Sequence, residues 1–244
     1  MTPPILVIRP EPGASHTLDA ARALGLAAHS FPLFAAMPRA WDAPAPDSFD
    51  ALLLGSANAL RHGGPALADY IGKPAYCVGE ATTRVAWSRG LIVEATGEGG
   101  LQDLLPQIIP DHPRLLRLAG EKRVALNPPP GMEIAERVVY ASLPLPFPPE
   151  LARLLLTSAL PAFILLLHSG EAARHFIAET DRLALPRHQI TAITIGPRVT
   201  EICTQAGRWS AIHTAPAASD AAMLALAAQT CQIGADRNLG PQAG

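Results

Sequence analysis

The feature that most limits how this chain can fold is a segment that occurs twice with the same length. "GEATTRVAWSRG" runs from Gly79 to Gly90, and "GPRVTEICTQAG" runs from Gly196 to Gly207. In each copy apolar residues recur three and four positions apart, which predicts a helix with one apolar stripe that stops at the second glycine. A chain that builds the same turn and helix twice is expected to contain two similar halves.

The elements around these helices repeat as well. "ALLLGSANAL" pairs with "FILLLHSGEAARHF", so that Ser56 and Ser169 correspond, and "AYCVG" pairs with "AITIG". "RLLRLAG" likewise resembles the first apolar run, "ILVI", and "ERVVYASLPL" resembles "AAHSFPLF". Buried strands that alternate with helices are typical of parallel sheets covered on both faces, so the sequence predicts an α/β protein built by duplication. The repeats alone divide the chain near residue 112.

The composition argues against several classes of function. The 244 residues carry a formal net charge of −2, so no basic surface for nucleic acid is expected. The cysteines are scattered, which favours free thiols in a reducing cytoplasm. The N-terminus lacks the pattern of a signal peptide, and the run "AFILLL" is too short to span a bilayer. The polar, glycine-rich tail from about residue 233 is predicted to be disordered.

Candidate ligand-binding residues lie where the expected strands end, because ligands bind at the carboxyl ends of strands in an open parallel sheet. Ser56, Ser169, Gly79 and Gly196 each follow an expected strand and precede an expected helix, whose free N–H groups can bind an anion. The two halves would thereby offer two backbone cradles for carboxylates or phosphates. The alternative is that these residues only cap helices.

Few charged or aromatic side chains near the strand ends suggest chemistry. Arg9, directly after the first strand, is the best-placed cation, whereas His168 is expected to be structural. Tyr140 lies at the junction of the two halves. The other cations near strand ends, which are expected to be solvated, are Arg117, Lys122, Arg123 and Arg198.

The usual sequence signatures of cofactor and metal sites do not occur. The first strand is not followed by GxGxxG, and neither a phosphate-binding GxxxxGK[ST] loop nor an HExxH pair is present. "HSGEA" does not have the GxSxG pattern of a serine nucleophile. We therefore expect neither a metal nor an organic cofactor.

In their order along the chain, these segments resemble the uroporphyrinogen-III synthase family. The resemblance covers nearly the whole chain, from Ile5 to about Gln229. No single segment is specific, and the ordered set of six carries the resemblance. The six segments are "ILVIRP", "ALLLGSANAL", "CVGEATTRVAWSRG", "RVVYAS", "AITIGPRVTEICTQAG" and "APAASDAAMLALA".

The resemblance implies both a fold and an activity. The fold is two similar, flavodoxin-like α/β domains joined by a two-stranded β-ladder, with the substrate in the cleft between them. Residues 1–34 and 147–244 would form a discontinuous domain, and residues 35–146 an inserted one. The activity is that of a lyase, which cyclises the linear tetrapyrrole hydroxymethylbilane to uroporphyrinogen III with inversion of ring D and loss of water. The family further implies a cytoplasmic monomer that needs no cofactor, in transient contact with the preceding pathway enzyme.

The resemblance also assigns roles to residues of this sequence. Tyr140 is expected to be the catalytic proton donor, because a phenol stays protonated at neutral pH and can assist the loss of a hydroxyl group as water. Most of the task is to hold the flexible, polyanionic substrate in the geometry that leads to inversion. The residues expected to bind substrate are Arg9, Ser56, Asn58, Gly79, Thr82, Ser169, Gly196 and Thr200.

The chain departs from the family pattern at several positions. Val199 stands where the second glycine motif usually has threonine, and Gly55 and His168 replace threonine at two strand ends. "NPPPGMEIAERV" is proline-rich where a helix start is expected. Two other functions therefore stay open: a non-catalytic two-domain binding protein for a small anionic ligand, and a flavin- or nucleotide-binding α/β protein. The missing phosphate-loop signature counts against the second.

Overall fold

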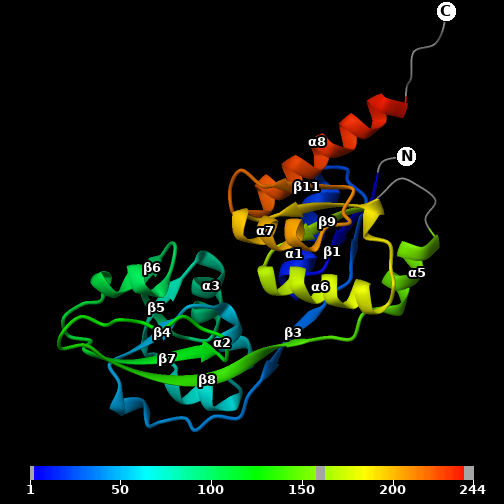
Figure 1. Cartoon of the computed structure of the whole chain (residues 1–244). Helices are drawn as coiled ribbons and strands as arrows, with labels where there is room; N and C mark the ends of the chain where they lie inside the picture. Colours follow the sequence, from blue (N-terminus) through cyan, green and yellow to red (C-terminus); the bar gives the residue numbers. More distant parts are fainter. Residues whose placement is uncertain (1–2, 158–162, 239–244) are drawn as a thin grey trace, which may run out of the picture. The chain divides into compact units, whose positions relative to one another are not determined.

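A computed structural model describes residues 3–157 and 163–238, with side chains described as far as residue 232. The chain divides into two compact units: unit 1 comprises Met1–Ala35 and Pro144–Gly244, and unit 2 comprises Ala36–Leu143. Each unit is built around a largely parallel sheet flanked by helices (Figure 1). The predicted fold class, two similar parallel-sheet α/β domains, is therefore confirmed.

Unit 1 contains a five-stranded parallel sheet in the order β2-β1-β9-β10-β11. Counted along the chain within the unit, this is the order 2-1-3-4-5 that characterises flavodoxin-like sheets. Its strands are β1 (Ile5–Val7), β2 (Ala28–Ser30), β9 (Phe163–Leu167), β10 (Ile190–Thr194) and β11 (Ala211–Thr214). Its helices are α1 (Gly13–Ala23), α5 (Pro149–Thr157), α6 (Gly170–Arg182), η4 (Arg187–Gln189), α7 (Pro197–Ala206) and α8 (Asp220–Asn238).

Unit 2 contains a six-stranded sheet in the order β3-β8-β7-β4-β5-β6, in which the pairs from β8 to β6 are parallel. Its strands are β3 (Phe34–Pro38), β4 (Ala51–Leu54), β5 (Pro74–Val78), β6 (Ile92–Gly97), β7 (Arg114–Gly120) and β8 (Glu133–Pro144). Its helices are η1 (Pro46–Ser48), α2 (Ala57–His62), η2 (Pro65–Tyr70), α3 (Glu80–Ser88), α4 (Leu101–Leu104) and η3 (Leu105–Gln107). The chain passes between the units within β3 and at the end of β8, and these two strands are neighbours in the sheet.

The two sheets confirm the pairing of elements that the repeats predict. The run β6-β5-β4-β7-β8 of unit 2 matches β11-β10-β9-β1-β2 of unit 1, strand for strand. The chain passes through these five positions in a different order in each unit. Of the five matched strands, β1 comes first in unit 1, whereas in unit 2 the first is β4, the counterpart of β9. The duplicated unit is therefore entered at a different strand in each half.

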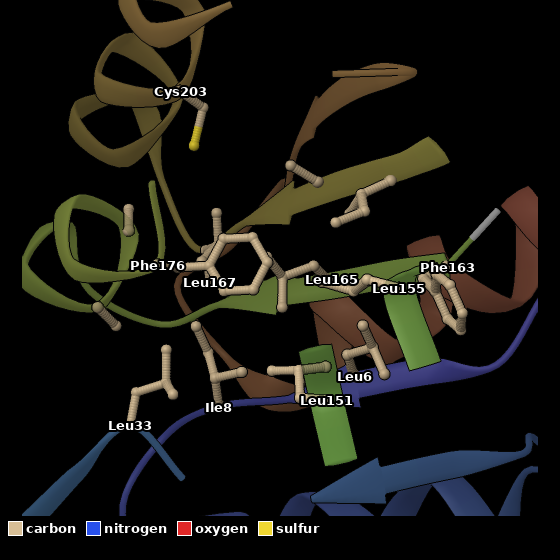
Figure 2. Packing of buried hydrophobic residues seen from close by; sticks show 14 of the residues in the cluster. Leu6, Ile8, Leu33, Leu151, Leu155, Phe163, Leu165, Leu167, Phe176 and Cys203 are labelled. Atoms are coloured by element: carbon tan, nitrogen blue, oxygen red, sulfur yellow. The ribbon is translucent and has the colours of Figure 1, made fainter. Parts of the chain in front are cut away.

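Apolar residues on both faces of the central strands explain why β1, β4, β9 and β10 are continuous buried runs, whereas the outer strands are partly exposed. In unit 1, Leu6 of β1 and Leu165 of β9 pack with Phe176 of α6 on the face that α5, α6 and α7 cover (Figure 2). Their neighbours Ile5 and Ile164 point to the opposite face, where α1 and α8 lie. Because successive side chains alternate between the faces, each strand contributes to two cores.

Unit 2 is covered less evenly. Helices α2, η2 and α3 pack on one face of the sheet. The other face is covered by the short α4 and η3 together with Leu126 and Met132, which belong to the loop between β7 and β8. This proline-rich loop contains no helix, in keeping with the departure noted in "NPPPGMEIAERV", because proline disrupts helix interiors. The loop therefore occupies the place where a crossover helix would usually lie.

The prediction of a disordered tail needs a correction. Helix α8 continues to Asn238, so the tail is helical from residue 233 to residue 238. Extending a helix that is already anchored, here by buried Leu224 and Cys231, costs far less than starting one. Residues 239–244 lie outside the described residues.

Candidate functional site

The topology of unit 2 places a cavity where ligands are expected in such folds. The direction of strand addition reverses between β4 and β7, and the crevice at such a switch point, outside the carboxyl ends of the strands, is the usual ligand site. A cavity of about 350 Å³ lies there, lined by Gly55 and Ser56 after β4 and by Gly120 at the end of β7. Tyr140 of β8 and the Gly99–Gly100 turn also line this cavity, which we call the β4–β7 cavity.

The charge of the β4–β7 cavity is one-sided. Its lining includes Arg117, Lys122 and Arg123 and no acidic residue. Arg117 is only 5% exposed, although its strand position suggested a solvated side chain. The expectation of a solvated side chain is therefore wrong for Arg117, whereas Lys122 and Arg123 are exposed and line the same cavity. Such a cavity suits an anionic ligand.

One carboxylate just outside the lining orders two of these cations. The Glu136 carboxylate accepts hydrogen bonds from Arg117 Nη1 at 2.5 Å and from Arg123 Nε at 2.8 Å. Burial acts to raise the pKa of Glu136, but the hydrogen bond from Arg123 and the charge of Arg117 outweigh it, and the pKa lies below its ordinary value. Glu136 is therefore ionised at neutral pH and holds both guanidinium groups at the edge of the cavity.

The loop that carries Lys122 and Arg123 is fixed at two points. Arg117 Nη1 donates to the carbonyl oxygen of Val124 at 2.9 Å. Further along, the side chain of Gln102 pairs with the backbone of Asn127 through two hydrogen bonds of 2.9 and 3.0 Å. The cationic loop is thus attached both to the sheet and to α4, and its charges have defined positions.

Tyr140 differs from the other two tyrosines in how its phenol is used. Tyr70 donates to the carbonyl oxygen of Pro44 at 2.5 Å, and the Tyr76 hydroxyl pairs with His112 Nδ1 at 2.9 Å. Within residues 3–157 and 163–232, no hydrogen bond to the Tyr140 hydroxyl is found. A phenol that lines a cavity without an internal partner is available to a ligand.

His62, at the end of α2, lies beside Tyr140, with ring centroids 6.2 Å apart. Burial lowers the pKa of His62, and the nearby charge of Arg61 lowers it further. At neutral pH the imidazole beside the Tyr140 ring is therefore uncharged.

The equivalent switch point of unit 1, between β1 and β9, is occupied by an internal cluster of ion pairs. Asp220, the first residue of α8, accepts two hydrogen bonds from Arg9 Nη1, at 2.7 and 2.8 Å. His168 Nε2 lies 2.7 Å from the same carboxylate, and Thr17 donates to it at 2.8 Å. Burial would raise the pKa of Asp220, but His168, Thr17 and Arg9 together lower it to about 2. The charge of Arg9 is therefore already compensated.

The paired serines occupy matching places in the two units, whereas the paired glycines differ in conformation. Ser56 caps α2 by accepting from Asn58 N, and Ser169 caps α6 by accepting from Ala172 N. Gly79 has φ of +77°, which favours glycine, whereas Gly196 is extended. Of the predicted substrate-binding residues, the cavity therefore includes Ser56, while the others lie elsewhere at strand ends and helix starts.

The threonine register clarifies the departure at Val199. Thr82 and Val199 are both buried, and each backbone N–H closes the first turn onto the preceding glycine, Gly79 or Gly196. The next residue in each copy bonds to the neighbouring strand: Thr83 to Thr96 at 2.7 Å, and Thr200 to Thr214 at 2.6 Å. Position 199 therefore holds a core side chain, and the feature that the two copies share is the threonine one residue later.

Comparison with known proteins decides the family. Residues 15–225 match the family model described as uroporphyrinogen-III synthase HemD. The chain belongs to the uroporphyrinogen-III synthase family. None of the curated proteins matches it significantly.

The solved structures to which this chain is similar include uroporphyrinogen-III synthases. The uroporphyrinogen-III synthetase of Helicobacter pylori 26695 has 17% sequence identity and a TM-score of 0.61, over 93% of this chain and 99% of that chain. A mutant uroporphyrinogen III synthase from the extremely thermophilic bacterium Thermus thermophilus has 16% identity and a TM-score of 0.46, over 95% and 99% of the two chains. The first of these similarities supports the two-domain α/β fold.

The described residues contain neither a helix that could span a membrane nor a group of side chains that could hold a metal ion. Among residues 3–157 and 163–238, no helix combines the length and the apolar character needed to cross a membrane. Over the side chains described, histidine, cysteine and carboxylate residues do not gather in groups of three or more that could hold a metal ion. All three cysteines are free and buried.

Proposed function

We propose that this protein is a uroporphyrinogen-III synthase, a lyase that closes hydroxymethylbilane to uroporphyrinogen III with inversion of ring D and loss of water. Family membership supports the reaction. The observation that carries the proposal on this chain is the β4–β7 cavity, whose lining combines three cations with an unused phenol, while the one carboxylate that pairs with Arg117 and Arg123 lies outside the lining. A linear tetrapyrrole with carboxylate side chains is a ligand of matching charge.

In this proposal the cations of the cavity bind substrate carboxylates. Arg123 and Lys122 lie on the anchored loop, so their charges are positioned before the ligand arrives. Preorganised cations bind an anion without a large cost in side-chain entropy. Holding a flexible substrate curled favours attack on the substituted carbon of the last ring over the spontaneous closure without inversion.

Tyr140 is the proposed catalytic acid. Its hydroxyl donates a proton to the leaving hydroxyl of the substrate, the carbon–oxygen bond breaks, and water departs. The cation left on the substrate then closes the ring, and a proton lost from the substrate after closure restores the phenol. The free hydroxyl supports this role, because Tyr140 lines the cavity and its proton is not used in a hydrogen bond to another described residue.

The remaining predicted site residues take different parts in the proposal. Ser56 lines the cavity and is kept as a binding residue, with Asn58 beside it on α2. Arg9 is engaged by Asp220, so its binding of substrate stays a prediction that competes with a structural role. Substrate contacts are also still predicted for the strand-end residues Gly79, Thr82, Ser169, Gly196 and Thr200. We further expect a cytoplasmic monomer that meets the preceding enzyme of the pathway only transiently.

The test is the isomer produced. Hydroxymethylbilane incubated with the purified protein should yield mainly uroporphyrinogen III, whereas the buffer blank yields the isomer without inversion, as separated by chromatography after oxidation. An isomer ratio equal to that of the blank would refute the proposal.

The role of Tyr140 is tested by Tyr140→Phe. We expect the rate of isomer III formation to fall by about 10²- to 10⁴-fold, the usual contribution of a general acid. Tyr70→Phe is the matched control, since its phenol is bound to Pro44 and lies outside the cavity. Full turnover by Tyr140→Phe would remove Tyr140 from the mechanism without affecting the assigned activity.

A further inference from the structure

The pairing of β7 with β8 contains one irregularity, and it lies next to Tyr140. Ala119 pairs with Val138, but the next residue, Gly120, pairs with Tyr140. Val139 is thus an extra residue in β8, which makes this a β-bulge. Bulges bend a strand and redirect the side chains that follow.

The bulge decides which face of the sheet Tyr140 occupies. Leu116 and Leu118 of β7 belong to the core under α2 and α3, and by alternation Gly120 points to the same face. Val139 is buried in that core, and Tyr140, the next residue along, also packs against it. In a regular strand two successive side chains would point to opposite faces. The extra residue therefore moves the Tyr140 ring opposite Gly120.

Gly120 leaves the space that the ring uses. A methyl group at this position would lie 2.7 Å from Cζ of Tyr140, 2.9 Å from its hydroxyl oxygen and 3.0 Å from Cε2. Such distances are shorter than van der Waals contact, so the ring would have to move. The φ angle of Gly120 is outside the positive region, and its backbone is compatible with alanine. The phenol, and not the conformation of the chain, requires glycine here.

We propose that Gly120 and the bulge at Val139 are a positioning device for the Tyr140 phenol, with Gly120 as the positioning residue. The glycine lets the phenol end of the ring approach the end of β7, and Tyr140 thereby lines the β4–β7 cavity. This inference rests on the proposed function for its catalytic meaning, but the contact itself can be tested without any activity measurement.

The first experiment observes the ring directly. Tyrosine labelled with ¹³C at Cζ gives one NMR resonance for each of the three tyrosines, and Tyr140→Phe identifies the one of interest. We expect Gly120→Ala to shift the Tyr140 resonance and leave those of Tyr70 and Tyr76 in place. Gly97→Ala is the matched control, since Gly97 also ends a strand of this sheet and its added methyl would meet the Leu104 side chain at 3.0 Å. This control should leave the Tyr140 resonance unmoved.

The second experiment measures catalysis. Because a displacement of about 1 Å can cost on the order of 10²-fold in rate, we expect Gly120→Ala to lower kcat by about 10- to 100-fold with little change in KM. In the Tyr140→Phe background the same substitution should cause almost no further loss, which a general defect of folding would not reproduce. A loss that multiplies fully in the double variant would overturn the positioning role.

The outcomes separate this inference from the function. If Tyr140→Phe retains full activity while Gly120→Ala still shifts the resonance, the contact stands and the catalytic role of Tyr140 fails. If the resonance and kcat both stay unchanged in Gly120→Ala, the inference is wrong whatever the function. Should Gly120→Ala not fold, nuclear Overhauser effects between the Gly120 α-protons and the Tyr140 ring in the wild-type protein decide: their presence supports the contact, and their absence refutes it.

Discussion

The switch points of the two units have the same topology and different chemistry. In unit 1, the ends of β1 and β9 meet a carboxylate, Asp220, that compensates Arg9 and engages His168. In unit 2, the corresponding ends of β7 and β4 line a cavity together with three cations, and the Glu136 carboxylate that pairs with Arg117 and Arg123 lies outside the lining. The duplicated fold thus places a carboxylate at the strand ends in one unit and beside the cavity in the other, where an anionic ligand can meet the cations.

The difference can be traced to the first residue of one helix. Helix α8 follows β11 and begins with Asp220, whereas α4 follows the matching strand β6 and begins with Leu101. An acid in the first turn of a helix is favoured by the helix dipole, so Asp220 is stable at that position in addition to its ion pair. Leu101 contributes an apolar wall to the cavity instead. An acid at the start of the following helix therefore distinguishes the switch point of unit 1 from that of unit 2.

The largest expected effect comes from removing the acid of unit 1. Asp220→Ala leaves the Arg9 and His168 groups without their partner, and we expect the free energy of unfolding to fall by about 2 kcal/mol, because the ion pair is only partly buried. Urea unfolding measures it. The control is Asp19→Ala, which removes an exposed ion pair with Arg22 and should hardly change stability. Equal effects of the two substitutions would show that the cluster does not hold unit 1 together.

The low pKa of Asp220 predicts that the free energy of unfolding depends on pH in the acid range. The pKa of Asp220 is about 2 in the folded protein, below its ordinary 3.8. Its contribution to stability is thus fully present above about pH 4 and is lost as the pH falls toward about 2, a difference of about 2 kcal/mol. Unfolding curves of the wild type and Asp220→Asn between about pH 5 and pH 2 should converge as the pH falls. A constant gap between them would contradict the assigned pKa.

A smaller effect is expected when one cation of each unit is replaced, on KM in unit 2 and on stability in unit 1. Lys122→Met removes a charge from the lining of the open cavity, and we expect KM for hydroxymethylbilane to rise about tenfold, the value of one charge-assisted hydrogen bond. Arg9→Met removes a charge that Asp220 compensates, and it should lower stability while leaving KM nearly unchanged. Steady-state kinetics of the two variants test the contrast. A larger rise in KM for Arg9→Met would restore Arg9 as a substrate-binding residue.

The smallest effect concerns what the two units share. Ser56→Ala and Ser169→Ala each remove an N-cap acceptor, that of Asn58 N in α2 and that of Ala172 N in α6, and each should cost about 1 kcal/mol of stability. Because Ser56 lines the cavity, Ser56→Ala is expected to raise KM as well, and a rise in KM for Ser169→Ala would support the substrate contact predicted for Ser169. Thermal unfolding and kinetics of the pair measure both quantities. Unequal costs would mean that the two caps do not have equivalent roles.

Local and short-range features of the fold were predictable from the sequence. The serine caps depend on atoms within three residues, and the strand assignments depend on apolar runs that the surrounding sheets bury on both sides. The register of the repeated glycine segments was equally predictable. Even the threonine shift could be read from the alignment of Thr83 with Thr200, although its meaning needed Thr96 and Thr214.

The candidate site was predictable only in part. Ser56 was identified from its place at a strand end, and Tyr140 from its place at the junction of the halves together with the resemblance; both line the cavity. Arg117 was interpreted as solvated, because nothing near it in the sequence shows that it is buried or that Glu136 pairs with it. A bulge is also invisible to periodicity, since one inserted residue exchanges the faces of a strand without changing its composition.

By itself, the sequence determined that the protein has two copies of one α/β unit, where their strands and helices lie, and to which family the chain is similar. Only the tertiary structure showed that a cavity forms at the switch point of unit 2 and that Asp220 lies at the strand ends of unit 1. These features depend on contacts such as the ion pair of Arg9 and Asp220, which are 211 residues apart, and the pairing of Gly120 with Tyr140 across a bulge. Periodicity and capping act within a few residues, whereas ion pairs and close contacts depend on distances that exist only once the sheets have formed.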